Sequence, residues 1–179
     1  MLCPRGRPPP RDPGGPVTGR DMPGKCSRHT ARIARLLPGT LVSVEPAIRA
    51  AVADDLPAVL TLWQEARAEA SRTDDIQSLR QLIEHDRSAL LIAEADGRMA
   101  GSVIAAWDGW RGSIYRLAVL PAYRRQGLGR RLVYEAEKRL SALGAVRVQA
   151  VVVQADARAM GFWRAGSWRE QTGQLRFTR

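Results

Sequence analysis

The amino-acid sequence predicts a mixed α/β fold in which one sheet carries helices on both faces. Three apolar segments with the composition of strands follow one another in the middle of the chain, and turn residues separate them. Segments with apolar residues at helical spacing lie before and after them. The whole order is strand, two helices, three strands, helix, strand, helix and strand, which is typical of a layered α/β domain.

The domain is expected to begin with a short strand and two helices. Ala47–Val52 is the strand, and Asp54 is placed to cap the following helix, with Pro57 in its first turn. A second, more polar helix is predicted over Asp75–Asp86. The apolar face of the first helix, which should lie in the core, consists of Leu56, Val59, Leu60 and Trp63.

Three neighbouring strands are predicted next. Ala89–Ala95 and Arg98–Trp107 are joined by Asp96-Gly97, a dipeptide that favours a tight hairpin turn. Asp108-Gly109 marks the next turn, and Ser113–Val119 is the third strand. Because the turns are short, these strands are expected to be antiparallel neighbours.

The last part of the domain is predicted to contain a long helix and shorter elements. The helix covers Gly127–Leu143, where leucines recur at spacings of three or four, and Gly144 is a natural C-terminal cap. Val146–Val153 is a nearly continuous apolar run, typical of a strand with both faces covered. A short helix over Asp156–Arg164 and a last strand or hairpin over Trp168–Phe177 follow.

The first 43 residues differ in composition from the rest. They hold eight of the 11 prolines, both cysteines and none of the aromatic residues. Such a segment cannot bury enough apolar surface to offset its ordering entropy, so residues 1–43 are predicted to be disordered and residues 44–179 to form the folded domain. With eight basic and two acidic residues, the segment carries +6 of the net charge of +10. It is interpreted as a solvated extension, with nucleic-acid or membrane binding, organelle import or a start further downstream as the alternatives.

Several classes of protein are excluded by composition. Cys3 and Cys26 lie outside the predicted domain, which therefore has neither a disulfide framework nor a thiol nucleophile. No apolar run approaches the ~20 residues that span a bilayer. We expect a cytoplasmic protein that binds no metal, no membrane and no nucleic acid.

The segment Ile114–Leu140 carries the information about function. It reads as an apolar strand, a turn at Pro121, a basic loop and the long helix. Gly127 and Gly129 lie where the loop becomes the helix, and a helix start offers unpaired N–H groups and a partial positive charge to an anion. Four arginines surround the same point, namely Arg124, Arg125, Arg130 and Arg131. This pattern predicts a phosphate-binding loop; a plain turn is the alternative.

This segment resembles the GNAT superfamily of N-acetyltransferases. Arg124-Arg125-Gln126-Gly127-Leu128-Gly129 fits that family's motif of Arg or Gln, two variable residues, Gly, one residue, and Gly or Ala. The strand LAVLPAYRR before the motif, the long helix after it and the closing segment Ala155–Trp168 are similar too. The resemblance implies a mostly antiparallel central sheet with a splay between its two central strands.

The resemblance also implies a co-substrate, acetyl-CoA, and the residues that bind it. The backbone amides around Gln126, Gly127, Leu128, Gly129 and Arg130 would hold the pyrophosphate, and Arg124 and Arg125 would supply charge. The free backbone of Leu117, Ala118 and Val119 would pair with the pantetheine arm, and the amide of Val119 would lie at the thioester carbonyl. A primary amine, on a small molecule or a protein, would then attack the thioester directly.

The sequence departs from the family pattern at its proton-transfer residues. The family's tyrosine on the closing helix is replaced by Phe162 or Trp163, depending on where one gap is placed. Tyr115 stands where many members carry a glutamate, and it is the one candidate catalytic residue. These departures keep an alternative open, a catalytically silent acyl-CoA-binding module. Trp110 could form a pocket wall for the amine, and a homodimer is expected from an exposed terminal strand.

Overall fold

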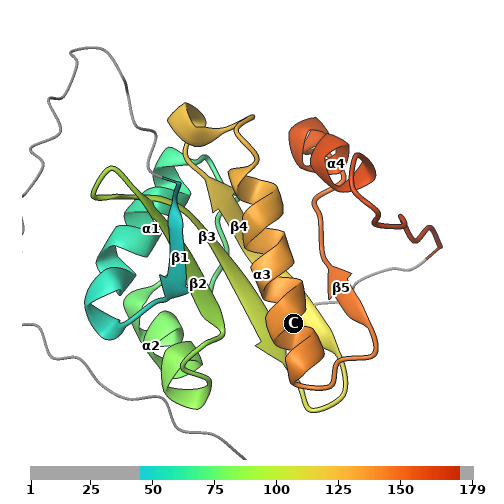
Figure 1. Ribbon diagram of the computed structural model, residues 1–179, viewed down its shortest axis with the longest axis horizontal. Helices are drawn as coiled ribbons and strands as arrows, with labels where there is room; N and C mark the ends of the chain where they lie inside the picture. Colours follow the sequence, from blue (N-terminus) through green and yellow to red (C-terminus); the bar gives the residue numbers. More distant parts are fainter. Residues whose placement is uncertain (1–44, 174–179) are drawn as a thin grey trace, which may run out of the picture. The chain divides into compact units, whose positions relative to one another are not determined.

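The computed structural model describes residues 45–173 and has the predicted mixed α/β architecture (Figure 1). Five strands form one sheet in the order β1-β2-β3-β4-β5. All neighbouring pairs are antiparallel except β4 and β5, which are parallel. The mostly antiparallel sheet predicted from the sequence is therefore confirmed.

The elements follow the predicted order up to the closing helix. The strands are β1 (Ala47–Ala50), β2 (Leu90–Ala95), β3 (Arg98–Trp107), β4 (Gly112–Val119) and β5 (Val148–Ala150). The α-helices are α1 (Leu56–Glu65), α2 (Ile76–His85), α3 (Leu128–Ala142) and α4 (Ala157–Arg164). Two 3-10 turns, η1 (Ala53–Asp55) and η2 (Pro121–Tyr123), precede α1 and α3.

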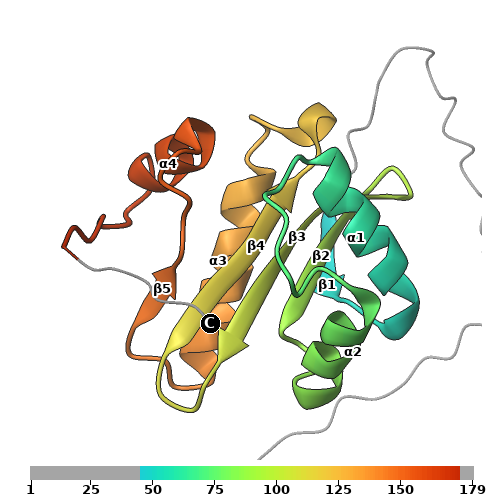
Figure 2. The same cartoon turned by 180° about the vertical axis from the view of Figure 1, so that it is seen from behind.

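Helices cover both faces of the sheet, as the two opposite views show (Figures 1 and 2). Helices α1 and α2 pack on one face, where Leu56, Val59 and Trp63 are buried against Leu90 and Ile92. The other face carries α3, whose buried residues are Leu128, Leu132, Val133, Ala136 and Leu140. Trp63 therefore belongs to the core, as its position on the helical stripe predicted.

The hairpin at Asp96-Gly97 is confirmed. Both residues have positive φ angles, 52° and 71°, which is the backbone of a two-residue hairpin turn of the type that Asp-Gly favours. It joins β2 directly to β3, and the predicted bounds of β3 coincide with the observed ones. Local turn chemistry is thus sufficient to place this part of the sheet.

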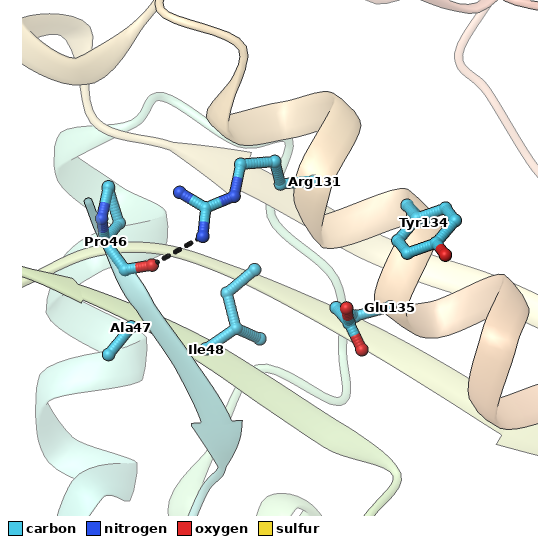
Figure 3. Close-up of a pocket in the computed structure, with 6 residues that line it drawn as sticks. All are labelled: Pro46, Ala47, Ile48, Arg131, Tyr134 and Glu135. Atoms are coloured by element: carbon cyan, nitrogen blue, oxygen red, sulfur yellow. Dashed lines mark hydrogen bonds between the residues drawn. The ribbon is translucent and has the colours of Figure 1, made fainter.

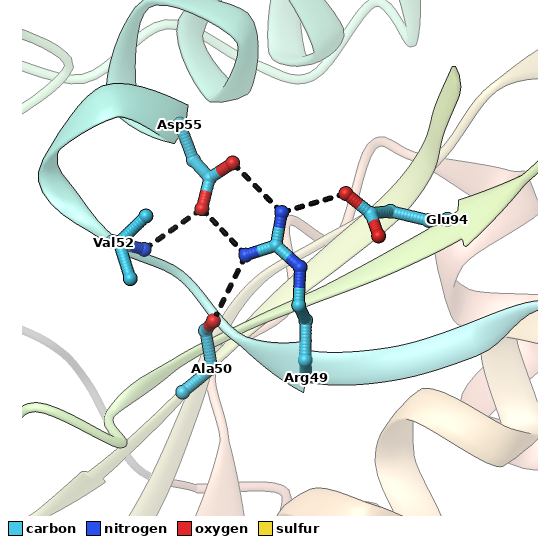
Figure 4. A network of polar contacts seen from close by, with 5 residues as sticks. All are labelled: Arg49, Ala50, Val52, Asp55 and Glu94. Carbon is cyan, nitrogen blue, oxygen red and sulfur yellow. Dashed lines mark hydrogen bonds and ion pairs between the residues drawn. The ribbon is translucent and has the colours of Figure 1, made fainter. Parts of the chain in front are cut away.

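The start of α1 differs from the prediction at one residue. Asp55, not Asp54, stabilises the turn η1 before α1, because its carboxylate accepts a hydrogen bond from the amide of Val52 at 2.8 Å. The same carboxylate accepts two hydrogen bonds from Arg49, at 2.7 and 2.9 Å (Figure 4). Arg49 also reaches Glu94 at 2.6 Å. This cluster ties β1, β2 and η1 together, and the prediction for Asp54 was wrong because both aspartates precede the helix equally well in sequence.

The predicted strand Val146–Val153 is mostly wrong. Only Val148–Ala150 forms a strand, and the side chain environment is not that of a strand covered on both faces, since Val146 is 89% exposed. Val151 and Val153 are exposed as well. The apolar run reads as buried because composition alone cannot tell a covered strand from one at the edge of a sheet.

Two further predictions concern the ends of the chain. Residues 168–173 contain no strand, and the rest of the predicted last strand lies outside the described residues. The predicted disordered segment, residues 1–43, also lies outside them. No helix within residues 45–173 is long and apolar enough to cross a membrane.

Candidate functional site

Strand β4 separates from β5 halfway along its length. The two strands pair at Gly112–Val148, Ser113–Gln149 and Ile114–Ala150, and no strand of the described chain pairs with this edge of β4 beyond Ile114. From there the chain after β5 leads away to α4 (Figure 2). A splay is therefore present, but it lies between β4 and the edge strand β5 of the described sheet and not between two central strands as predicted. Within the described residues it leaves residues 115–119 with a free backbone edge.

A β-bulge lies where this free edge begins. On β3, Ser102 pairs with Ala118 and Ile104 pairs with Tyr115, so Val103 alone faces two residues, Arg116 and Leu117. The φ angle of Arg116 is 52°, in the left-handed region that residues other than glycine rarely adopt. The bulge increases the twist of β4 at the point where its pairing with β5 has ended.

The backbone of Val119 faces the open side of β4. The amide of Leu120 donates to the carbonyl of Ala100 on β3, at 2.9 Å. Because the direction of N–H and C=O groups alternates along a strand, the N–H and C=O of Val119 point away from β3. Its carbonyl accepts a hydrogen bond from Nε of Arg124 at 2.9 Å. The amide of Val119 is thus the backbone donor that the end of β4 presents to the splay.

The start of α3 presents a row of free amides beside this edge. The first helical hydrogen bond runs from the amide of Arg131 to the carbonyl of Gly127, at 3.1 Å. Within residues 45–173, the six amides from Arg125 to Arg130 have no protein acceptor, and no side chain caps the helix. Gly127 has a φ angle of 83°, and a side chain there would meet no atom within 4 Å. This helix start is therefore open and rich in donors, the arrangement that binds phosphate groups.

The four arginines near the loop have different surroundings. Arg124 turns inward and donates to the carbonyls of Val119 and Ala66, the latter at 2.8 Å. Burial lowers the pKa of Arg124, and Arg158 and Arg67 lower it further. Arg125 and Arg130 are exposed. Among the residues that the structure describes, Arg125 and Arg130 have no ion-pair partner, so their charges can attract a ligand, while Arg124 fixes the loop.

Arg131 lies on the side of α3 that faces β1. Its guanidinium donates to the carbonyl of Pro46 at 3.0 Å, in a shallow groove between β1 and α3 (Figure 3). Ile48, Tyr134 and Glu135 line the same groove. Arg131 thus braces the edge strand β1 and does not join the loop, although sequence proximity had grouped it with the loop arginines.

Helix α4 packs against the start of α3 through Phe162. A Cβ atom on Gly129 would lie 3.2 Å from Cε2 of Phe162, so a glycine allows this close approach. Trp163 instead packs edge-on against Trp168, with ring centroids 4.7 Å apart. Of the two residues that sequence alone could not separate, Phe162 is therefore the one beside the helix start.

The sequence model described as the acetyltransferase (GNAT) family matches residues 56–166, which include both the splayed strand and the donor-rich helix start. The chain belongs to this family. The predicted resemblance is confirmed. The free edge of β4 and the start of α3 both lie within the matched GNAT domain.

Known relatives agree with this assignment. An acetyltransferase of Pectobacterium atrosepticum is 33% identical over 110 residues, which cover 62% of this chain and 78% of the relative. Solved structures share the fold at 19% identity. An aminoglycoside 6'-N-acetyltransferase from Acinetobacter haemolyticus has a TM-score of 0.62 and covers 74% of this chain and 97% of its own.

Two of the similar structures contain coenzyme A. The aminoglycoside N-acetyltransferase AAC(6')-Iy, in complex with CoA, has a TM-score of 0.63 and covers 80% of this chain and 98% of its own. The PaiA N-acetyltransferase from Thermoplasma acidophilum, also with coenzyme A, has a TM-score of 0.61 and covers 68% and 88%. The sequence identity to this chain is 19% in both cases, so the two structures show a shared fold and no more.

The remaining candidate residues lie apart from the loop. Tyr115 is half-buried and packs on the α1 side of the sheet, next to the bulge. Trp110 is exposed in the turn before β4, under the guanidinium of Arg111 and at the end of β4 opposite to the splay. The prediction of Trp110 as a pocket wall therefore loses its basis. Residues 45–173 contain no group of three or more His, Cys, Asp or Glu side chains placed to hold a metal ion.

Sequence reasoning missed the bulge at Arg116. Glycine and asparagine are the residues that predict a left-handed backbone, and an arginine does not predict one. It also missed that Arg124 is a structural arginine, since a basic residue next to a glycine-rich loop suggests charge for a ligand and not bonds to carbonyls.

Proposed function

We propose that this protein transfers the acetyl group of acetyl-CoA to a primary amine, by direct attack of the amine within a ternary complex. One observation carries the proposal. Within residues 45–173, six consecutive amides, Arg125 to Arg130, have no protein acceptor, and they adjoin an edge of β4 that no described strand pairs with from Tyr115 to Val119. These two features together suit a ligand that has a diphosphate at one end and a linear amide-containing arm at the other.

The residues present fit the diphosphate. The site has donors from six amides, two exposed arginines and the positive end of a 15-residue helix. The position of a side chain on Gly127 is open space, so an anion can approach the backbone closely there. Gly127, Leu128, Gly129 and Arg130 would hold the phosphates through their amides, with Arg125 and Arg130 adding charge.

The end of β4 fits the reacting group. Leu117, Ala118 and Val119 would pair with the arm, and the free amide of Val119 would donate to the thioester oxygen as negative charge develops on it. When bound, acetyl-CoA supplies an activated acyl group on a thiol leaving group. The hydrogen bond from Arg124 fixes the carbonyl of Val119, and with it the orientation of Val119, so that the amide of Val119 keeps pointing into the splay.

Proton transfer would need little help from side chains. The amine must be neutral to attack, so the rate should rise with pH until the amine has lost its proton. The departing alkyl thiolate has a pKa of roughly 8.5, so solvent can protonate it. Tyr115, on the strand that carries the free edge, is the side chain we propose for catalytic assistance.

A second function is favoured by one specific observation. The ring of Phe162, which cannot donate a proton, stands beside the start of α3 where the family often has a tyrosine. This supports the alternative of a catalytically silent acyl-CoA-binding module that acts through a partner. Both functions require acetyl-CoA binding, and only the first requires turnover.

Release of CoA across a panel of amines separates the two. We would mix the full chain with acetyl-CoA and each amine, and follow the free thiol with a colorimetric reagent. The two cysteines, Cys3 and Cys26, give one constant background per molecule. Aminoglycosides form the first arm of the panel, because similar folds act on them, followed by polyamines, amino acids and lysine peptides. Binding by calorimetry without turnover in any arm supports the silent module, and absence of binding contradicts both.

A further inference from the structure

The left-handed residue at the bulge of β4 is held by its own side chain. The guanidinium of Arg116 donates to a carboxylate oxygen of Asp74 and to the carbonyl of Glu69, both in the connection between α1 and α2. Its central carbon lies 4.9 Å from the centroid of the Trp63 ring. The side chains of Arg116 and Asp74 are only 15% and 18% exposed, so water screens this pair less than a surface ion pair.

The partners of Arg116 are themselves fixed. Trp63 donates from Nε1 to the hydroxyl of Ser102 at 2.9 Å, and Ser102 is fully buried on β3 next to the bulge. Asp74 also accepts from the amide of Ser71 at 2.9 Å, which closes the turn that carries it. Arg116 is therefore held by three groups, and two of them, Trp63 and Asp74, are themselves fixed by further hydrogen bonds.

The bulge changes which way the side chains of β4 point. Ile114, Leu117 and Val119 pack on the α3 face, and Tyr115 and Ala118 pack on the α1 face. Arg116 reaches the α1 side as well, so two consecutive residues point to one face. Regular alternation does not allow this. Arg116 is thus the inserted residue, and its conformation sets the register of the free edge after it.

We propose that Arg116 is a positioning residue for the acyl transfer, because its grip on Asp74, Glu69 and Trp63 keeps the β4 bulge and thereby the free edge at 117–119. The proposal rests on the proposed binding of acetyl-CoA along that edge. An L-residue without such a grip is disfavoured in the left-handed region by roughly tenfold. If only about a tenth of the molecules kept the bulge, the apparent Kd for acetyl-CoA would rise about tenfold.

Replacement of Arg116 by alanine and by glycine tests this directly. Arg116→Ala removes the grip and keeps the backbone cost, so we expect the Kd for acetyl-CoA to rise about tenfold in calorimetry. Arg116→Gly removes the grip and the cost together, so binding should return to within about threefold of the wild type. A residue that only stabilises the fold would lower the melting temperature when replaced and leave the Kd for acetyl-CoA unchanged. Equal or weaker binding by the glycine variant overturns the proposal.

Three further variants guard against a trivial loss of folding. Asp74→Ala removes the carboxylate that Arg116 binds, so it should weaken acetyl-CoA binding. The double variant with Asp74→Ala and Arg116→Gly should bind acetyl-CoA as well as Arg116→Gly does. Arg139→Ala is the matched control, since it breaks a comparably buried ion pair with Asp86 on the far half of α3. It should lower the melting temperature and leave the Kd unchanged. A rise in Kd for this control equal to that of Arg116→Ala contradicts a specific role.

Amide hydrogen exchange separates this proposal from the proposed function. If the wild type itself does not bind acetyl-CoA, the proposed function is wrong and the calorimetry says nothing more. Exchange still reports the bulge, because loss of it would let β4 and the chain after Ala150 extend their pairing. We then expect new protection of the amide of Val119, which faces away from β3, in Arg116→Ala and none in Arg116→Gly. The same exchange pattern in both variants rejects the proposal.

Discussion

Arg124 donates from Nε to the carbonyl of Val119, 2.9 Å away, and so joins the start of the loop before α3 to the end of the free edge of β4. Its second bond, 2.8 Å to the carbonyl of Ala66, fastens both to the end of α1. One half-buried side chain therefore sets the relative position of the two parts that acetyl-CoA would touch.

Replacing Arg124 should loosen this junction. Arg124→Ala leaves two carbonyls without their charged donor, so we expect the free energy of unfolding to fall by ~2 kcal/mol. The Kd for acetyl-CoA should rise about tenfold, and by the same factor at low and at high salt, because the lost contribution is positional. Urea unfolding and calorimetry at two salt concentrations measure these effects.

Arg125→Ala is the matched control for Arg124. Arg125 is exposed, and its contribution to binding a diphosphate is the attraction between charges, which salt screens. Its loss should weaken binding severalfold at low salt, hardly at all at high salt, and leave stability unchanged. If the two variants have the same salt dependence, the structural role assigned to Arg124 is wrong.

Substitution of Gly127 should separate backbone strain from access to the phosphate site. At a φ angle of 83°, Gly127→Ala should cost ~1–2 kcal/mol of stability, and its methyl group would stand in the open space where the phosphates are expected. Gly127→Asn tolerates the left-handed backbone better, so it should cost less stability but block the site more. Thermal unfolding and acetyl-CoA titration of both variants test this. If the Kd for acetyl-CoA rises only in proportion to the loss of stability of each variant, the phosphates do not approach this glycine.

The parts of the fold that the sequence predicts well are those with local causes. The turn at Asp96-Gly97 needs two residues with positive φ, and the dipeptide provides them whatever surrounds it. Likewise α3 follows from its leucine spacing and from Gly127 before it. In these places sequence neighbours decide the structure, so a reading of the sequence alone finds it.

The parts that it misses are decided by contacts distant in sequence. Arg116 adopts a left-handed backbone because Trp63 and Asp74, more than 40 residues earlier, hold its side chain. Arg124 turns inward because Ala66 offers it a carbonyl. The run Val146–Val153 reads as a buried strand, yet β4 turns away after three pairs. The open helix start after the loop was therefore predictable, and the distant groups that shape it were not.

The pair of Arg49 and Asp55 should make stability depend on pH in the acid range. The hydrogen bonds from Arg49 hold the pKa of the Asp55 carboxyl below its ordinary value, and the amide of Val52 lowers it further. The unfolded chain then takes up a proton at a higher pH than the folded one, so this stabilisation is complete above about pH 5 and is lost as pH falls through the folded pKa.

Asp55→Asn should remove that contribution. We expect a loss of ~1 kcal/mol at pH 7, a modest value because Arg49 is partly exposed, and a smaller loss at pH 3. Urea unfolding at pH 3, 4, 5 and 7 measures the difference. Asp54→Asn, at the neighbouring exposed position, is the control and should have no effect at any pH. A loss of equal size at pH 3 and pH 7 would contradict the argument.

Phe162→Tyr should add the proton donor that the closing helix lacks. The ring of Phe162 lies beside Gly129 at the start of α3, so a hydroxyl on it would stand at the site proposed for acetyl-CoA, whereas the ring of Trp163 is packed against Trp168. If protonation of the thiolate limits the rate, kcat should rise roughly tenfold or more, because a positioned general acid contributes about 10²–10⁴-fold. The KM for acetyl-CoA should change little, since the substitution adds one oxygen at the rim of the site.

The pH profile gives this prediction its sharpest test. Solvent protonates the thiolate without a local donor, so the gain from the tyrosine should be present only while its hydroxyl keeps its proton, below a pKa of about 10. Trp163→Tyr is the matched control, with the same new side chain one residue further on, and should show no gain. A kcat for Phe162→Tyr equal to that of the wild type at every pH would mean that amine attack or product release limits turnover. The absent tyrosine would then carry no weight in favour of a silent module.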